Sequence, residues 1–365
     1  MKNNWIFISS LRTRQSLLAD FLSNCKKNNL NFHLICSSRA LKRRGRREYW
    51  SFSKLKILPL SFLVFIIFWP LIWVCSKLIF LFKFISKKPS SIVLINWPEK
   101  ILLSSLARRF SKNVIWLEYP DFSVKDLPWL IKKLYFKKAR NVKILSFSKE
   151  KIEYLKNNGV NDAEYIFFPL SRTIIEQDSI FKNLANQEKR GRFVIGSVLY
   201  GLPKDQAEIL LSALAIANSV CPIIELVIIG EGKNRKQIQW LAKRMNLERK
   251  VWLAGPASDF GKWLNHLDLY VIASRKPGLE EAAWAMSAMQ IGLPVIGPMQ
   301  SWLADFITPK NGALVDIEDA ETLARQFINL QQNEELCKEF GKEATKIANN
   351  FSFERFFETM VNLLS

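Results

Sequence analysis

The sequence is poor in the residues that build metal sites, disulfide frameworks and histidine-dependent catalytic centres. Its 365 residues include 2 histidines, His33 and His266, far apart in the chain. The 5 cysteines are odd in number and scattered without metal-ligand spacing, which favours a reduced, cytosolic environment. We therefore expect no metal site and no histidine triad, and interpret both histidines as structural.

Acidic residues are scarce in one half of the chain only. Residues 1–180 contain 32 Lys+Arg and 12 Asp+Glu, whereas residues 181–365 contain 21 of each, so the first half carries the whole net charge of +20. This half would attract an anionic partner. No nucleic-acid-binding signature accompanies the charge, and the basic cluster at 41–47 lies near an apolar run, which favours anionic lipid over nucleic acid.

An apolar leader peptide is not predicted, because residues 1–4 lead directly into a short strand at 5–9. Residues 57–76 form an uncharged run of 20 residues, which is long enough to span a bilayer. A span there would separate strands of one sheet, so residues 57–85 are predicted to form one or two helices in the membrane interface. A packed core helix and a true span remain alternatives. A basic amphipathic helix at 127–140 is a second candidate membrane face.

The second half alternates between short apolar runs and helical spacing. Runs at 226–229, 251–253, 267–274 and 294–298 are typical of buried parallel strands, and helices are predicted at 236–245 and 282–291, the latter capped by Gly292. This order predicts a doubly wound α/β sheet. Ligands of such sheets bind beyond the carboxyl ends of the strands, here marked by Gly230, Gly255 and Ser274.

Four blocks in this half match one family in order and spacing. They are Ile-Ile-Gly230-Glu-Gly-Lys-Asn-Arg235, Val251-Trp-Leu-Ala-Gly255, Asp268-Leu-Tyr-Val-Ile-Ala-Ser274 and Ala288-Met-Gln-Ile-Gly292-Leu-Pro-Val-Ile. They resemble the donor domain of the retaining GT-B glycosyltransferases (glycosyl transferase group 1, family 4-like). The resemblance implies an α/β GT-B fold, in which two Rossmann-like, doubly wound parallel-sheet domains flank a cleft. It places an acceptor-side domain at 1–178, a nucleotide-sugar donor domain at 190–348, and a helix at 349–365 that returns to the first domain.

The sequence also departs from the family pattern at positions that matter for the site. Ser197 stands where the family has a phosphate-binding Arg, and Lys204 lies beside the place of the phosphate-binding Lys. Ser287 and Leu279 occupy the places of the two glutamates that are eight positions apart. The altered motif leaves open a catalytically degenerate GT-B scaffold that acts as a binding or partner subunit.

The candidate site residues follow from the strand ends and from the family's motifs. Catalytic candidates are Glu280 on the donor side and Glu118 and Asp121 where relatives have a His-Asp pair; turn and helix-capping roles are the alternatives. Donor-binding candidates are Gly196, Ser197, Lys204, Gly230, Gly232, Arg235, Gly255, Ser274, Arg275, Lys276, Gly278, Glu281 and Ser287. Acceptor-side candidates are Ser10, Arg12, Arg14 and Asn96, with plain solvation as the alternative for both arginines.

These features together predict a glycosyltransferase. It would move a sugar from a nucleotide diphosphate sugar to a lipid-linked or cell-envelope glycan acceptor, while bound peripherally to an anionic membrane at its cytoplasmic face. Retention of configuration and independence of metal are implied by the resemblance. The nucleotide sugar would be a co-substrate, and no cofactor is expected.

Overall fold

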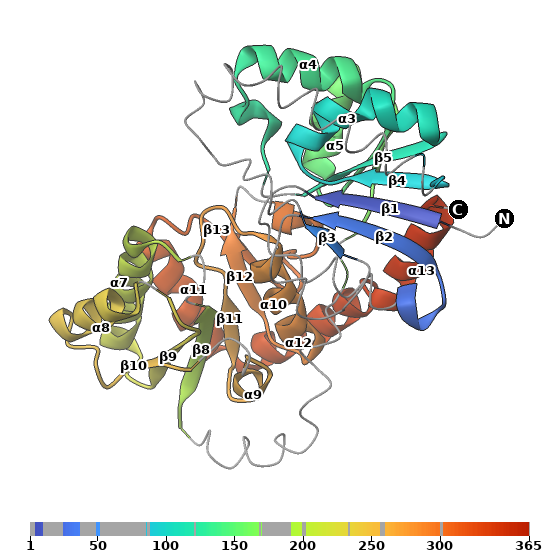
Figure 1. The fold of residues 1–365 in the computed structure, drawn as a ribbon. Coiled ribbons are helices and arrows are strands. Elements are labelled where there is room, and N and C mark those ends of the chain that lie inside the picture. The colour runs from blue at the N-terminus through green and yellow to red at the C-terminus, as the bar shows by residue number, and fades with distance from the viewer. Residues whose placement is uncertain are drawn as a thin grey trace. The chain divides into compact units, whose positions relative to one another are not determined.

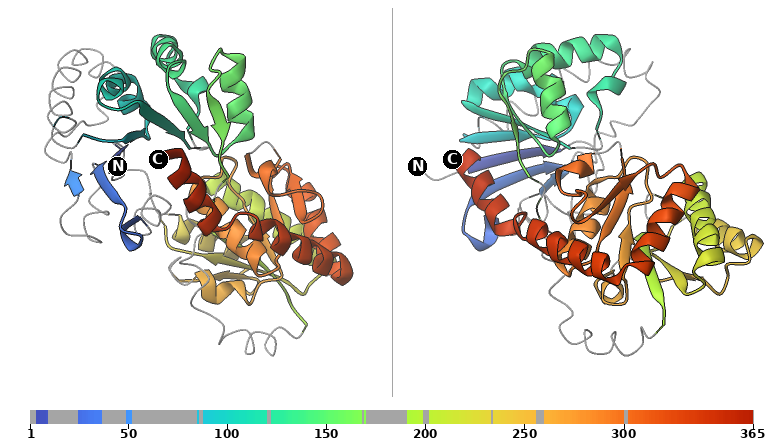
Figure 2. Two further views of the ribbon diagram at one scale, coloured as in Figure 1. Left: turned by 90° about the vertical axis from the view of Figure 1, so that its right-hand side faces the viewer. Right: turned by 180° about the vertical axis from the view of Figure 1, so that it is seen from behind.

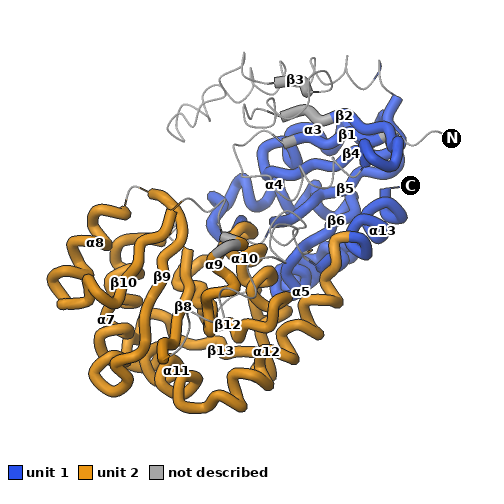
Figure 3. Tube along the Cα trace, turned by 90° about the horizontal axis from the view of Figure 1, so that it is seen from below, with its two compact units in different colours: residues 1–168, 354–365 blue, residues 169–353 orange. Residues whose placement is uncertain are grey.

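The computed structural model describes most of the chain outside its first 90 residues and one long linking segment. The described residues are 4–9, 25–36, 49–51, 85, 88–119, 122–167, 169, 191–198, 202–232, 234–255, 260–299 and 302–364. The chain divides into two units, residues 1–168 with 354–365 and residues 169–353 (Figure 3). Each unit contains one sheet, and every pairing within the sheets is parallel.

The first unit is built on a seven-stranded sheet in the order β3-β2-β1-β4-β5-β6-β7 (Figure 1). Its strands are β1 (Asn4–Ser9), β2 (Asn31–Cys36), β3 (Tyr49–Ser51), β4 (Ser91–Leu94), β5 (Asn113–Glu118), β6 (Lys143–Ser146) and β7 (Ala163–Tyr165). Its helices are α3 (Trp97–Phe110), α4 (Trp129–Ala139), α5 (Lys149–Asn157) and α13 (Phe353–Leu364), with a 3-10 turn, η3, at Val124–Asp126. The central strands are apolar and fully buried, as a parallel sheet covered on both faces requires.

The two faces of this sheet are covered by different parts of the chain. Alternate residues of β1, β4 and β5 pack in a core with α3, α4 and α5. The carboxyl-terminal helix α13 contributes Phe356, whose ring lies 6.2 Å from that of Phe147 and 6.1 Å from that of Phe167. Asn113 Nδ2 also donates to the Leu363 carbonyl at 3.0 Å. The last helix of the chain is thus an integral part of the first unit.

The second unit is built on a six-stranded sheet in the order β10-β9-β8-β11-β12-β13 (Figure 1). Figure 2 shows the ribbon from two further sides. Its strands are β8 (Phe193–Val198), β9 (Ile224–Ile229), β10 (Val251–Leu253), β11 (Leu269–Val271), β12 (Val295–Pro298) and β13 (Gly312–Val315). Its helices are α7 (Lys204–Val220), α8 (Arg235–Arg244), α9 (Phe260–Leu264), α10 (Leu279–Gln290), α11 (Ala320–Gln332) and α12 (Glu334–Asn349), with a 3-10 turn, η6, at Trp302–Asp305. Its core lies between the sheet and α7, α8 and α11.

Local chemistry accounts for the boundaries of these elements. Gly292 adopts φ +88° after α10, and Leu293 N–H donates back to the Ala288 carbonyl at 3.0 Å, so the predicted glycine cap is confirmed. The strand predicted at 267–274 is shorter, spanning Leu269–Val271. The predicted basic helix at 127–140 is confirmed as α4.

The predicted interfacial segment 57–85 lies outside the described residues, apart from Ile85. In the part of the chain that the structure does describe, no helix combines the length and the apolar character needed to cross a membrane.

Candidate functional site

The carboxyl ends of four neighbouring strands form the predicted donor edge of the second sheet. The order β10-β9-β8-β11 brings Gly255, Gly230, Ser197 and Ser274 to the same edge. Gly230 N–H donates to the Gly255 carbonyl at 2.8 Å, which joins the turns after β9 and β10. Gly230 has φ +116°, a conformation that side chains rarely adopt. The edge is therefore lined by backbone, as the sequence predicts, and Gly232 next to it is exposed.

The side chain of Arg235 holds these two turns together. Its guanidinium donates to the carbonyls of Leu253 at 2.8 Å, Ala254 at 2.6 Å and Gly230 at 3.3 Å. A planar guanidinium can bind several carbonyls in this way because its donors diverge. Predicted as a donor-binding residue, Arg235 is engaged with the chain itself and shapes the edge through these carbonyls.

The glycine and serine of β8 are committed to the interior of the sheet. A Cβ on Gly196 would lie 2.2 Å from Leu267 Cδ1, so the close approach of Leu267 requires glycine. Ser197 is 1% exposed, and its hydroxyl donates to the Val271 carbonyl at 2.9 Å. Both residues position the strand end, and the Ser197 side chain does not point out of the sheet toward a ligand.

Lys204 opens α7 beside this edge. It is exposed, and the residue before the helix, Pro203, provides no side-chain cap for the first N–H groups. Uncapped N–H groups and a lysine in the first helical turn favour an anion electrostatically. Of the predicted phosphate contacts, Lys204 is the one whose position in the fold suits that role best.

The loop between β11 and α10 is held against the start of α7. Arg275 N–H donates to Gln206 Oε1 at 3.0 Å. The Arg275 side chain pairs with Glu318 and lies 3.6 Å from Asp205. Its charge is therefore already matched by two carboxylates, while Lys276 beside it is exposed. Gln206 and Asp205 carry no sequence signal for this contact, because their partner lies 69 or 70 positions away.

The two glutamates at the start of α10 have different environments. Glu281 Oε2 accepts from Gly278 N–H at 2.8 Å, so this carboxylate binds back to the residue that precedes α10. Burial raises the pKa of Glu281, an effect opposed by its hydrogen bonds with Ser274 and Gly278. Burial, and then the charge of Glu281, raise the pKa of Tyr270. Glu280 lies in the same first turn, and both glutamates are partly exposed. The carboxylate of Glu281 is the one committed to the start of its own helix.

Ser287, in the place of the family's second glutamate, is fully buried in the middle of α10. Its hydroxyl donates to the Ala283 carbonyl of the preceding turn at 2.9 Å. A serine bonded to its own helix offers nothing to a ligand. The described residues therefore place no carboxylate at this position.

In the first unit, Glu118 is the centre of a buried polar cluster. It is completely buried, with Lys100 Nζ 2.5 Å and Tyr135 Oη 2.6 Å from Oε1. Lys151 Nζ lies 3.9 Å from Oε2, which accepts no hydrogen bond. Burial, followed by the charge of Glu118, raises the pKa of Tyr135 well above its ordinary value. These contacts describe a structural ion pair at the end of β5, and the carboxylate predicted to be catalytic has no exposed surface in this arrangement.

Asn96 also has a structural partner. It caps α3, and its backbone N–H and Nδ2 donate to Glu99 Oε1 at 2.7 and 3.0 Å. The other candidates on this side, Ser10, Arg12, Arg14 and Asp121, lie outside the described residues. Among the residues that are described, no group of three or more His, Cys, Asp and Glu side chains is placed to hold a metal ion.

Comparison with known proteins shows what the second half of the chain is similar to. Residues 177–347 match the family model of glycosyl transferases group 1. Putative glycosyltransferase EpsD of Bacillus subtilis is 30% identical over 165 residues, 45% of this chain and 42% of that protein. Poly(ribitol-phosphate) alpha-N-acetylglucosaminyltransferase of Staphylococcus aureus is 26% identical over 175 residues, 47% of this chain and 35% of that protein. The match thus spans less than half the length of each relative.

Solved structures extend the likeness to the whole chain at the level of the fold. Anabaena HepE in complex with UDP has a TM-score of 0.77 at 15% identity, covering 100% of this chain and 99% of that one. The same protein in complex with UDP-glucose gives 0.74 at 14% identity, with 99% of each chain covered. Two parallel-sheet Rossmann-like units in one chain are the GT-B fold. The four sequence blocks, the sheet order and the family match agree, and together they show that residues 177–347 are similar to the glycosyl transferases group 1.

Proposed function

We propose that this protein transfers a sugar from a nucleotide diphosphate sugar to a lipid-linked or cell-envelope glycan. The family match of the second unit carries the proposal. The Staphylococcus relative is named for transfer of N-acetylglucosamine to poly(ribitol phosphate), and HepE was solved with UDP-glucose, which supports a glycan acceptor and a UDP-sugar donor.

The donor would bind at the carboxyl edge of the second sheet. Its diphosphate would lie at the start of α7, where Lys204 is exposed above uncapped N–H groups. N–H groups and a lysine placed in this way stabilise the negative charge that develops on a leaving diphosphate. Glu280 would contact the sugar, and the turns held by Arg235 would bind the base through backbone groups.

The reaction would exchange one bond at the anomeric carbon of the sugar. The acceptor oxygen would form a bond to that carbon, the diphosphate would leave with the bonding electrons, and the acceptor proton would pass to the diphosphate. Retention of configuration and independence of metal belong to this proposal. Because Glu118 is fully buried and paired with Lys100, we assign it to support of the β5 end rather than to proton transfer.

The acceptor side would bind an anionic membrane surface at the cytoplasmic face. Helix α4 buries Ile131, Tyr135 and Ala139 against the first unit. On its first turn Trp129 is 75% exposed and Leu130 is 55% exposed. Apolar side chains beside exposed lysines suit the boundary between lipid headgroups and acyl chains.

A thermal-shift screen of the purified protein against UDP-, GDP-, ADP- and CMP-sugars tests the donor. A ligand at 100 times its dissociation constant adds about 2.7 kcal/mol to the free energy of unfolding. We expect one nucleotide class to raise the melting temperature, followed by sugar transfer in a radiolabel assay. A well-folded protein that none of these donors stabilises would instead support the catalytically degenerate scaffold, which the buried Ser287 already makes worth testing.

A further inference from the structure

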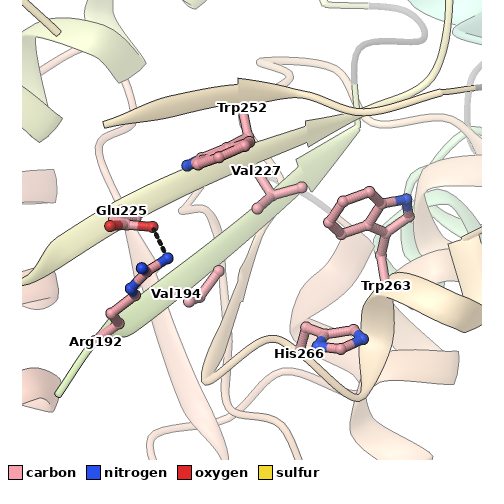
Figure 4. A pocket seen from close by; sticks show the side chains of 7 residues that line it. All are labelled: Arg192, Val194, Glu225, Val227, Trp252, Trp263 and His266. Carbon is pink, nitrogen blue, oxygen red and sulfur yellow. Dashed lines mark ion pairs between the residues drawn. The ribbon is translucent and has the colours of Figure 1, made fainter. Parts of the chain in front are cut away.

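A pocket of about 330 Å³ opens on one face of the second sheet (Figure 4). Val194 and Glu225 are register partners on β8 and β9, and Val227 is the register partner of Trp252 on β10. Residues two apart on a strand share a face, so these four side chains lie on the same side of the sheet. The alternate residues, such as Ile195, pack in the core on the other side.

This pocket is separate from the proposed donor edge. Glu225 and Val194 lie in the amino-terminal halves of their strands, whereas the donor edge begins at Gly230 after β9. Five residues of strand, at about 3.3 Å each, separate Glu225 from Gly230 by about 16 Å. Val227 and Trp252 are the lining residues nearest the donor edge, and each lies three residues, about 10 Å, before Gly230 or Gly255. The pocket therefore opens onto the face of the sheet, and neither glycine is part of its lining.

Two indole rings form its walls. Trp252 is 53% exposed although it lies on a strand. Trp263 on α9 is partly buried and contacts His266, with ring centroids 6.3 Å apart in a T-shaped arrangement. Figure 4 shows Val227 between the two indoles, so an apolar floor lies between two aromatic walls.

The polar end of the pocket carries no net charge. Arg192 Nη1 lies 3.6 Å from Glu225 Oε2, and their side chains are 55% and 13% exposed. The pair provides diverging donors and an acceptor at the pocket rim, with the two charges compensating each other. A phosphate-bearing ligand would meet no unmatched cation there, and a purely apolar ligand would cover polar groups without replacing their water contacts.

We infer that this pocket binds a neutral saccharide unit of a glycan chain. A sugar ring has an apolar face of C–H groups, which fits against an indole, and a rim of hydroxyls, which Arg192, Glu225 and the indole N–H groups can bind. The site is a second glycan-binding site on the donor unit, in addition to the proposed transfer site. It does not require transfer to occur, and so its test is independent of the proposed reaction.

Isothermal titration of the full chain with two neutral probes, maltotriose and the trisaccharide of N-acetylglucosamine, tests the site. The titration is run with and without saturating UDP. We expect at least one trisaccharide to bind equally well in both conditions. Trp252→Ala should weaken that binding at least tenfold, because truncation of an aromatic anchor removes most of the contact.

Trp240→Ala is the matched control. Trp240 on α8 is 52% exposed, nearly the same as Trp252, and stacks with Arg244 away from the pocket. It should leave saccharide binding unchanged, and both variants should keep the wild-type unfolding midpoint within a few degrees. The inference is overturned if neither trisaccharide binds, if both tryptophan variants lose binding equally, or if UDP displaces the sugar.

Discussion

The two sheets of this protein end in different ways at their carboxyl edges. In the first unit, β5 ends on Glu118, which is completely buried and paired with Lys100. In the second unit, the corresponding edge ends on glycines, on Ser197, which bonds to backbone, and on Ser274, which bonds to the Glu281 side chain. An exposed lysine opens the neighbouring helix. A buried ion pair fills the space it occupies, whereas an edge of backbone groups leaves donors for a ligand. The end of β5 is thus closed by a few side chains, whereas the described strand ends of the second sheet are lined by backbone groups.

The largest effect on stability is expected from a substitution in the ion pair between Lys100 and Glu118 at the end of β5. Lys100→Met removes the nearest cation and leaves the buried Glu118 with Tyr135 and the more distant Lys151, which should lower the free energy of unfolding by about 3 kcal/mol. Equilibrium urea unfolding, followed by far-UV circular dichroism, measures this loss.

The double variant Lys100→Met with Glu118→Gln is the control. It removes both charges, so it should recover a large part of the loss. If Lys100→Met alone lowers the free energy of unfolding by less than about 1 kcal/mol, the ion pair does not hold the end of β5 together.

The next effect concerns the support of the open edge. Arg235→Lys keeps the charge but loses the fork that binds three carbonyls, so we expect a loss of about 2 kcal/mol in stability. We also expect about tenfold weaker binding of the nucleotide sugar, because misplaced turns cost orientation. Denaturant unfolding and titration calorimetry measure the two effects. An unchanged donor affinity would show that the turns keep their shape without Arg235.

A smaller effect is expected at the exposed cation. Lys204→Ala should weaken donor binding by about five- to tenfold, equivalent to about 1–1.4 kcal/mol. The loss should shrink as salt is added, because exposed charges are screened. Lys236→Ala is the control, since Lys236 is also exposed in a first helical turn, that of α8. Equal losses of donor affinity in both variants would indicate a general electrostatic attraction rather than a contact between Lys204 and the phosphate.

The smallest effect is a dependence of stability on pH at the start of α10. Burial raises the pKa of Glu281 above its ordinary value of 4.5 in the folded chain, so the folded state binds more protons than the unfolded state just above that pH. Its contribution to stability therefore falls as pH rises from about 4.5 through the folded pKa.

Glu281→Gln removes this titration and keeps an oxygen that can accept from Gly278 N–H. The Gln variant should thus gain in stability relative to wild type as the pH rises, measured by urea unfolding at pH 4 to 7. A difference that does not change with pH would mean that Glu281 ionises as freely as in the unfolded chain.

Much of the second sheet could be predicted from its apolar runs. The strands at 226–229 and 251–253 and the cap at Gly292 were expected from burial and from backbone chemistry that act locally. The directions of single polar side chains could not be predicted. Ser197 has a hydroxyl suited to phosphate, yet it bonds to Val271, a residue 74 positions away.

The candidate site shows the same limit. The sequence predicted which strand ends form a donor edge and showed the altered glutamate positions, and it left function and capping open for Glu280 and Glu281. The structure assigns the cap to Glu281 because its carboxylate reaches Gly278 N–H. The sequence and the structure both place the Glu118 carboxylate at a strand end. Only the structure shows that Lys100, 18 positions earlier in the chain, lies beside it.

By itself, the sequence determined the doubly wound pattern, the confinement of the net positive charge to the first half and the likeness of the second half to one family. Periodicity and composition suffice for these properties because they depend on neighbours along the chain. Only the tertiary structure decided which polar groups are satisfied internally and which remain for a ligand. Arg235 bonds to the two turns, Ser287 bonds to its own helix and Lys204 is left exposed. Hydrogen bonds and ion pairs act over about 3–4 Å, and distant segments are brought that close only by folding.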